Sequence, residues 1–359
     1  MKINVLKVHN GDCIHISYKD NGRPINIVID SGSRKAYQEE VKEKRPPRKI
    51  IIVDGEFKKL IKKLKDKSEI INLLIITHVD DDHIGGVLKW MESQTFDSSM
   101  IEKVWFNSGQ LINEYFNKNL ENDNKQSFTL DDFDSVKTSI PDGISFEDKI
   151  EEYEIWDRKI IKADDIYKEF GAKFLILSPT ERNLARLLTK WKKEKPISIK
   201  TSTSENLEYK KTLKELLAED KNLSDSSKHN GSSIAFILEI EDKKLLFLGD
   251  CLHQTILKRM EKLKIDSLQV DMVKISHHGS KNNTSNRLLE KIDCNKYVIS
   301  TDGNNHNHPN KVTLARIIKN NSNCEIYLNY KDDLENKIFQ PQDYKDFQFS
   351  ILDTDELII

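Results

Sequence analysis

The densest group of side chains able to do chemistry in this sequence lies in the segment Thr77–Gly86, which reads THVDDDHIGG. Two histidines and three aspartates occupy the six positions from His78 to His83. Imidazole and carboxylate together suit zinc, manganese or iron, and two histidines with two aspartates can be shared between two ions. An alternative is that the aspartates only cap a helix that begins near Ile84. One aspartate would need no other explanation, whereas the whole group favours metal binding.

The element that must position this group is the apolar run Ile70–Ile76 directly before it. The run is short, continuous and rich in β-branched residues, which predicts a buried strand. Open α/β architectures place their sites at the carboxyl ends of such strands. We expect the glycine pair Gly85–Gly86 to let the following chain turn away sharply without crowding the ions.

Three further short β-rich runs end in residues that can bind a metal ion, with glycine, serine or cysteine close behind. One such strand end alone is a weak signal. Four of them in one chain indicate a shared cluster. The three runs are Ile25–Ile29 before Asp30, Lys244–Gly249 before Asp250, and Val270–Ser276 before His277 and His278.

The order of these motifs resembles the metallo-β-lactamase superfamily, and most closely the metallo-β-lactamase domain of the ComEC competence proteins. The usual loop of the superfamily is H-x-H-x-D-H, and Asp80 in place of the middle histidine is the ComEC-like variant. The resemblance covers roughly residues 1–110 and 171–335. It implies an α/β fold, a four-layer αββα sandwich with a largely helical insertion. Other matching stretches are Gly11–Cys13, Asn230–Ser233 and His306–Pro309.

The resemblance also implies two divalent metal ions, zinc or manganese, and a set of ligands for them. Two positions stay open, since Asn230 competes with His229 and His278 with His277. We prefer His277 because it directly ends its strand, and His229 could equally be a solvated loop side chain. The resulting assignment gives one ion to His78, Asp80 and His229, the other to Asp82, His83 and His277, and shares Asp250 between them.

Divalent ions lower the pKa of a bound water and polarise the oxygen that gains charge during ester hydrolysis. We expect Asp82 to be the most sensitive catalytic position, because it contacts an ion and can also orient the attacking water. His308 could protonate the leaving oxygen, or it could simply form a His-Pro turn before a helix. Asp30 is expected to orient the metal loop by hydrogen bonding without contacting an ion.

The function that the resemblance implies is metal-dependent hydrolysis of phosphodiesters, as in a nuclease. The same chemistry serves small esters, lactones and thioesters, because a fold does not fix a function. A third alternative is a non-catalytic, metal-stabilised scaffold that binds a protein partner through residues 107–228. The formal net charge of −2 gives no general attraction to nucleic acid, so a nucleic acid substrate would need a local basic patch. The basic run Lys190–Lys195 is more typical of a solvated helix face.

The four cysteines are widely scattered and form no CxxC pair, which is typical of reduced thiols in a cytoplasmic protein. The chain runs from Met1 straight into an alternating strand without a signal-peptide core. No apolar run approaches transmembrane length, so we expect no membrane association. At 359 residues the chain can form one long domain over residues 1–359.

The periodicity of the apolar residues and the positions of turn-forming residues predict the order of the elements. Strands are expected at residues 2–8, 13–18 and 25–30, and a helix over Ile51–Leu64. A second helix should follow the metal loop at Ile84–Ser93. Residues 107–228 are expected to be an insertion beside the cleft, with a turn at Pro141–Gly143 and a strand at Lys173–Leu177 that rejoins the main sheet.

Overall fold

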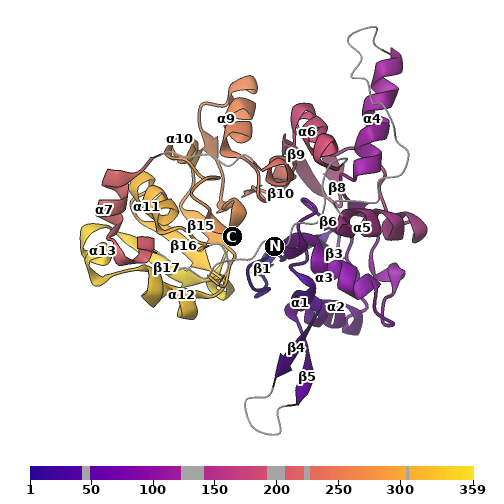
Figure 1. Ribbon diagram of the computed structural model, residues 1–359, viewed down its shortest axis with the longest axis horizontal. Coiled ribbons are helices and arrows are strands. Elements are labelled where there is room, and N and C mark those ends of the chain that lie inside the picture. The colour runs from indigo at the N-terminus through magenta and orange to yellow at the C-terminus, as the bar shows by residue number, and fades with distance from the viewer. Residues whose placement is uncertain (43–48, 123–140, 192–206, 222–226, 305–306) are drawn as a thin grey trace.

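The computed structural model of the protein describes residues 1–42, 49–122, 141–191, 207–221, 227–304 and 307–359. Its strands form two large sheets, and helices cover the outer face of each (Figure 1). A hairpin formed by β4 (Gln38–Lys42) and β5 (Ile50–Asp54) projects away from this body. Within the described residues, none of the helices combines the length and the apolar character that crossing a bilayer requires.

The first sheet has the strand order β1-β2-β3-β6-β7. The turn between β2 and β3 contains Asn21 and Gly22, both with positive φ, as a tight hairpin requires. Strands β3, β6 and β7 run parallel, so the chain leaves β3 and β6 at the same edge of the sheet. The strand bounds are β1 Lys2–Val5, β2 Ile14–Asp20, β3 Arg23–Ile29, β6 Leu73–Ile75 and β7 Val104–Trp105.

The second sheet has the order β17-β16-β15-β13-β11-β10-β9-β8. Its strands from β11 to β17 are parallel neighbours, so the segments that follow β11 and β13 emerge side by side. Strand β9 contains the predicted strand 173–177 and lies in this sheet, as expected. The bounds are β8 Ile166–Glu169, β9 Ala172–Ser178, β10 Ala235–Ile240, β11 Lys243–Phe247, β13 Met272–Lys274, β15 Lys296–Ile299, β16 Cys324–Leu328 and β17 Phe349–Asp353; β12 Leu268–Gln269 pairs with β14 Ile292–Asp293 apart from it.

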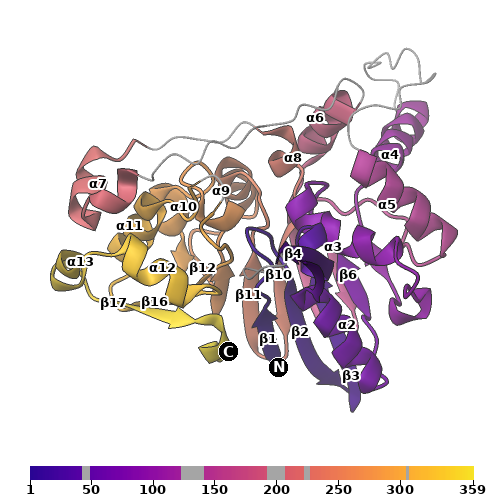
Figure 2. The ribbon, with the colours of Figure 1, turned by 60° about the horizontal axis from the view of Figure 1, so that its bottom comes forward.

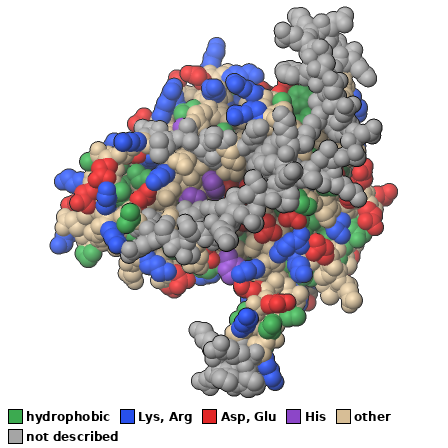
Figure 3. All heavy atoms as spheres, in the orientation of Figure 1, with side chains coloured by type: hydrophobic (Ala, Val, Ile, Leu, Met, Phe, Trp, Pro, Cys, Tyr) green, Lys and Arg blue, Asp and Glu red, His purple; other side chains and the backbone are tan. Residues whose placement is uncertain are grey.

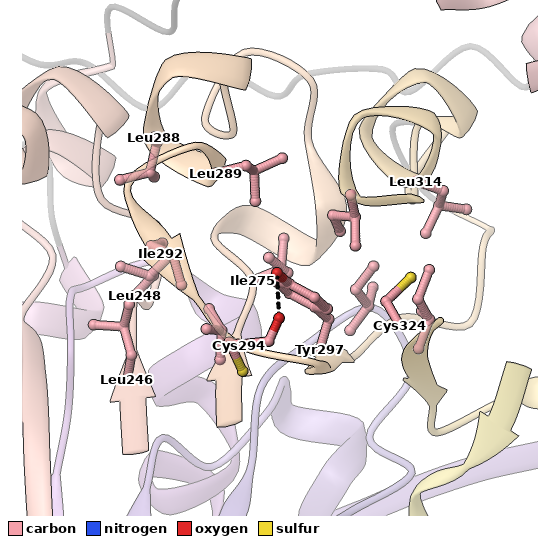
Figure 4. Packing of buried hydrophobic residues seen from close by; sticks show 14 of the residues in the cluster. Leu246, Leu248, Ile275, Leu288, Leu289, Ile292, Cys294, Tyr297, Leu314 and Cys324 are labelled. Atoms are coloured by element: carbon pink, nitrogen blue, oxygen red, sulfur yellow. Dashed lines mark hydrogen bonds between the residues drawn. The ribbon is translucent and has the colours of Figure 1, made fainter. Parts of the chain in front are cut away.

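Three apolar clusters separate the layers. One lies between the two sheets and contains Ile16 and Ile27 from the first sheet and Phe236 from the second. Another lies under the helices that cover the first sheet, and the third under those that cover the second (Figure 2). Figure 4 shows the third cluster, where Leu246 and Leu314 are among the buried side chains. The predicted four-layer αββα sandwich is therefore confirmed.

The covering helices form two groups with a few short turns between them. On the side of the first sheet they are α1 Arg34–Tyr37, α2 Glu56–Asp66, α3 Asp81–Met91, α4 Gly109–Asn122, α5 Pro141–Glu152, α6 Glu181–Trp191 and α8 Lys228–Gly231. On the side of the second they are α7 Leu213–Glu219, α9 His253–Lys262, α10 Asn286–Leu289, α11 Lys311–Asn320, α12 Lys331–Ile338 and α13 Pro341–Asp346. The 3₁₀ turns are η1 Ser98–Met100, η2 Leu207–Lys210, η3 His277–Gly279 and η4 Thr354–Glu356.

Two predicted elements differ from the structure. The helix expected over 51–64 is divided into β5 and α2, because the β-branched run Ile50–Val53 pairs with β4 and the helical period begins only at Phe57. The turn expected at 141–143 is the first turn of α5, where Pro141 occupies the helix start that tolerates proline. The assignment of 107–228 as one insertion within a single domain 1–359 stays a prediction.

Glu147 in α5 is a buried carboxyl that lies away from the strand ends, and its ionisation can be tested. Its carboxylate is buried and accepts a hydrogen bond of 2.5 Å from the Ser108 hydroxyl. Burial raises the pKa of this carboxyl from 4.5 to about 7. The folded state therefore keeps a proton that the unfolded chain releases, so this contribution to stability is complete below pH 4.5 and is lost as the pH rises through 7.

We therefore expect Glu147→Gln, which removes the buried charge, to raise the free energy of unfolding at pH 8 by about 1–3 kcal/mol. At pH 5 the same change should have little effect, because the carboxyl is then already protonated in the folded protein. Urea denaturation at the two pH values measures the difference. An effect of equal size at both would contradict the assigned pKa.

Candidate metal centre

The ligand-type residues predicted at separate strand ends meet at one edge of the sandwich. The backbone joins the two sheets there, since Ile234 N–H donates to the Thr77 carbonyl (3.0 Å). Within the second sheet, His277 N–H donates to the Gly249 carbonyl (2.9 Å), which ties the ends of β13 and β11 together. Three groups of three residues bring their ligand atoms within 4.8 Å of one another. Two of them combine residues from both sheets, namely His78, His83 and Asp250, and Asp82, His83 and His278. The third contains Asp12, Asp30 and His83.

Asp250 lies at the middle of this cluster and is almost fully buried. Its Oδ2 atom is 3.8 Å from His78 Nε2, 3.5 Å from His83 Nε2 and 3.7 Å from His277 Nε2. Asp82 lies at the other end, where its Oδ2 is 3.2 Å from His278 Nε2 and its Oδ1 is 3.9 Å from His83 Nε2. His83 therefore belongs to all three groups, and Asp250 contacts histidines from both sheets.

Several atoms that face one another in the cluster are buried and have no hydrogen-bond partner among the described residues. Buried polar atoms are almost always satisfied, so a convergent group of unsatisfied ones indicates a ligand. Imidazole nitrogens and carboxylate oxygens are the ligands that zinc and manganese take in proteins. The residues present thus fit divalent metal ions. The atoms are His78 Nε2, His83 Nε2, Asp250 Oδ1 and His278 Nε2.

The far sides of two imidazoles are held by hydrogen bonds. His83 Nδ1 is 2.8 Å from Asp30 Oδ2, and His278 Nδ1 is 2.8 Å from the Ser300 carbonyl oxygen. A carbonyl only accepts, so Nδ1 of His278 carries a proton, and Nε2 is the nitrogen that faces the cluster. Asp30 also accepts from the Thr77 amide and hydroxyl, both at 2.8 Å. These contacts hold the metal loop as expected of Asp30, and that Asp30 does not contact an ion stays a prediction.

The backbone is unusual at the residues that end these strands. Asp30, His277 and His278 have φ values of 57°, 49° and 53°, in the left-handed region that side chains other than glycine seldom adopt. Such conformations cost energy and concentrate at functional sites. Their presence at both strand ends indicates that the fold holds these side chains in place against a local preference.

The alternative between His277 and His278 gains a geometric basis. His278 is completely buried and lies in one group with Asp82 and His83. His277 is about a quarter exposed (25%), and its Nε2 faces Asp250. Its Nδ1 lies 3.1 Å from Asn283 Oδ1. Both histidines thus border the cluster, from opposite ends.

The remaining predicted residues surround the cluster at a greater distance or lie outside the described part of the structure. Asp80 Oδ2 is 3.6 Å from His78 Nε2, and Asp80 begins α3 without a side-chain capping bond. His308 is buried, with its ring centroid 5.0 Å from that of His277. His229 lies in α8, and its side chain is outside the described part of the structure. Asn230, the alternative to it, is buried with Nδ2 3.3 Å from His277 Nδ1.

The glycine pair after the metal loop has a different role from the one predicted. Gly85 and Gly86 lie inside α3, so the chain does not turn away there. A Cβ atom on Gly86 would lie 2.1 Å from the Ser31 carbonyl oxygen, and Gly86 N–H donates to the Gly32 carbonyl (2.8 Å). The expectation is therefore corrected: the glycines let α3 pack closely against the loop that carries Asp30.

Sequence reasoning missed a buried ion pair beneath the cluster. Lys274 Nζ lies 2.5 Å from Asp12 Oδ2, and Asp12 Oδ1 lies 3.4 Å from His278 Nδ1. Burial by itself would raise the pKa of Asp12, but Lys274 and His278 hold it below its ordinary value. The available signal was the lysine itself, since a charged residue within the apolar run 272–275 must have a buried partner.

The carboxylates around the histidines favour positive charge at the centre of the cluster. Burial lowers the pKa of His278, but Asp12 and Asp250 overcome this and raise it to about 10. Burial likewise opposes charge on His83, yet Asp250, Asp30 and Asp82 raise its pKa well above the ordinary value. A bound divalent ion would supply this positive charge instead, and its binding would displace protons from the histidines.

Asp82 connects the buried cluster to solvent. It lines a cavity of about 540 Å³ together with His9, Arg34, Asp81 and Asp302. Histidine side chains are visible near the middle of the face shown in Figure 3. A substrate in this cavity would lie beside Asp82.

Comparisons with known proteins match one part of the chain to a known family. No curated protein matches the chain. One similar solved structure is described as the crystal structure of a protein of unknown function from Enterococcus faecalis V583. The two sequences are 10% identical over 97% of this chain and 75% of that chain, with a TM-score of 0.30. The family model described as the metallo-beta-lactamase superfamily matches residues 25–155, the part of the chain that carries Asp30 and the metal loop from His78 to His83.

Proposed function

We propose that this chain is a hydrolase that uses two divalent ions, zinc or manganese, to cleave phosphodiesters. The observation that carries the proposal is the convergence of buried, unsatisfied imidazole nitrogens and carboxylate oxygens from both sheets. His78, Asp80 and Asp250 would hold one ion, with His229 or Asn230. Asp82 and His83 would hold the other, with His278 or His277.

Bound divalent ions supply an acidified water and stabilise the charge that a phosphodiester gains as it is attacked. Asp82 stands where the cluster meets the cavity, so its carboxylate can orient a water and accept its proton. Burial opposes ionisation of Asp82, but His83 and His278 lower its pKa, which keeps it ionised near neutral pH, as a metal ligand must be. His308, close to His277, is the candidate that protonates the leaving oxygen.

A phosphodiester is favoured over the neutral esters by two observations. Asp80 gives the metal loop its ComEC-like form. A groove rich in lysine and arginine also begins at Leu252, two residues after Asp250, and would attract an anionic substrate. Hydrolysis of a small ester, lactone or thioester is the alternative, and a non-catalytic partner-binding scaffold is the second.

The test begins with protein stripped by a chelator and reloaded with manganese or zinc. We expect more than one equivalent of metal, and metal-dependent hydrolysis of bis(p-nitrophenyl) phosphate that exceeds hydrolysis of p-nitrophenyl acetate, a lactone and a thioester. Faster turnover of a neutral ester would favour the alternative. Metal uptake without any turnover would favour the scaffold, and no uptake would overturn the proposal.

A further inference from the structure

A groove of about 660 Å³ lies between α6 and α9 and is strongly basic. Its six positive and two negative side chains leave a formal charge of +4, on a chain whose formal net charge is −2. Such a local concentration of one sign raises the local concentration of the opposite one. Figure 3 shows lysine and arginine side chains gathered over the surface where α9 lies. The cations are Lys162, Arg182, Arg186, Lys258, Arg259 and Lys262.

Much of this positive charge is not neutralised by the protein. Arg182, Arg186 and Lys258 are exposed, and in the described part of the chain their side chains form no ion pair. Arg259 is 4% exposed and pairs with Asp164, but its Nε–H has no hydrogen-bond partner among the described residues. A buried guanidinium with an unused N–H in a basic groove is suited to donate to an anion.

One end of the groove comes close to the metal centre. Leu252 lines it and follows Asp250 by two residues, which places their Cα atoms within about 7 Å. From there α9 carries Lys258 and Lys262 on one face, roughly 9 and 15 Å along the helix axis. The N-terminal turns of α6 and α9 both line the groove, and helix N-termini favour phosphate.

We propose that this groove binds the phosphate backbone of a nucleic-acid strand whose scissile phosphodiester lies in the metal centre, an inference that rests on the proposed function. The groove lining in the described residues includes no aromatic side chain, so the contacts are with the backbone and not with stacked bases. Binding should therefore be independent of sequence. At about 3.4 Å per nucleotide, a strand reaches Lys262 roughly four nucleotides beyond Leu252, or about six from Asp250.

The test measures binding without catalysis, on full-length protein in chelator. The double variant Arg182→Glu/Lys258→Glu is compared with a control, Lys337→Glu/Lys345→Glu, which reverses two exposed lysines of α12 and α13 outside the groove. Fluorescence anisotropy measures the binding of single-stranded DNA and RNA of 2, 4, 6 and 12 nucleotides, lengths on the order of that of the groove. We expect the double variant to bind the 12-mers roughly tenfold or more weakly, with the slope of log K against log salt reduced by about 1.4.

Affinity of the unaltered protein should rise with length up to about four to six nucleotides, and this rise should be lost in the double variant only. A preference for DNA or RNA would identify which backbone is the substrate. Equal binding by the double and control variants, or no oligonucleotide binding by the unaltered protein, would overturn the groove assignment. Groove-dependent binding without metal-dependent cleavage of any ester would instead overturn the proposed function and leave the groove standing.

Discussion

Replacement of Asp82 by asparagine should lower kcat/KM for a phosphodiester by about 10²–10⁴-fold, the largest loss of turnover among single substitutions. Asparagine keeps the shape of the side chain but removes the charge that orients the water, and an amide does not accept its proton. The contacts of Asp82 with His278 (3.2 Å) and His83 (3.9 Å) also lose their ionic character. Folding should survive, because the strand before the loop is apolar and buried and does not depend on the Asp82 carboxylate.

The matched control is Asp81→Asn, the same change one residue earlier in the same loop. Asp81 faces Arg34, with Oδ1 3.8 Å from Nε, and belongs to none of the three groups of ligand atoms. Its replacement should therefore cost far less activity than that of Asp82. Steady-state kinetics on manganese-loaded proteins, with a thermal melt and metal analysis of each, make the comparison. Near-normal turnover by a folded, metal-loaded Asp82→Asn protein would refute the hydrolytic role of this residue.

The parts of the centre that could be predicted from sequence are those that depend on short-range signals. An apolar β-branched run followed by His, Asp and Gly marks a strand end wherever it occurs, so the contexts of His78, Asp250 and His277 were visible without a structure. The four-layer fold followed from resemblance to a known family. The orienting role of Asp30 followed from its place at a neighbouring strand end, and the structure adds its contacts to Thr77 and His83.

The parts that could not be predicted depend on backbone angles and distant partners. Two adjacent left-handed residues turn His277 and His278 to opposite ends of one cluster, and nothing in the local sequence specifies those φ angles. Lys274 and Asp12 are 262 residues apart, so their pairing is a property of the assembled sheets. The helix predicted over 51–64 failed because two neighbouring elements were merged across Gly55, which begins α2.

Asp250→Asn should have the largest effect on metal retention. Asp250 is the residue whose carboxylate oxygen lies within 3.8 Å of three imidazole nitrogens, from His78, His83 and His277. Changes to residues that only support metal ligands typically weaken binding 10–100-fold, so loss of the shared carboxylate should exceed about 100-fold. The side chain is almost fully buried, so water has little access to replace the lost charge.

The comparison variant for this prediction is Asp242→Asn, at the opposite end of the β10–β11 hairpin, where the side chain is 82% exposed. Manganese and zinc titrations of chelator-treated proteins, followed by the metal-induced rise in melting temperature, measure the effect. The unaltered and Asp242→Asn proteins should show the same rise, and the Asp250→Asn protein almost none at equal metal concentration. The carboxylate holds positive charge at the junction of the two sheets, and asparagine removes the counter-charge that Asp250 supplies to the imidazoles for either a proton or an ion. Two tightly bound equivalents in Asp250→Asn would therefore place the ions elsewhere than at this junction.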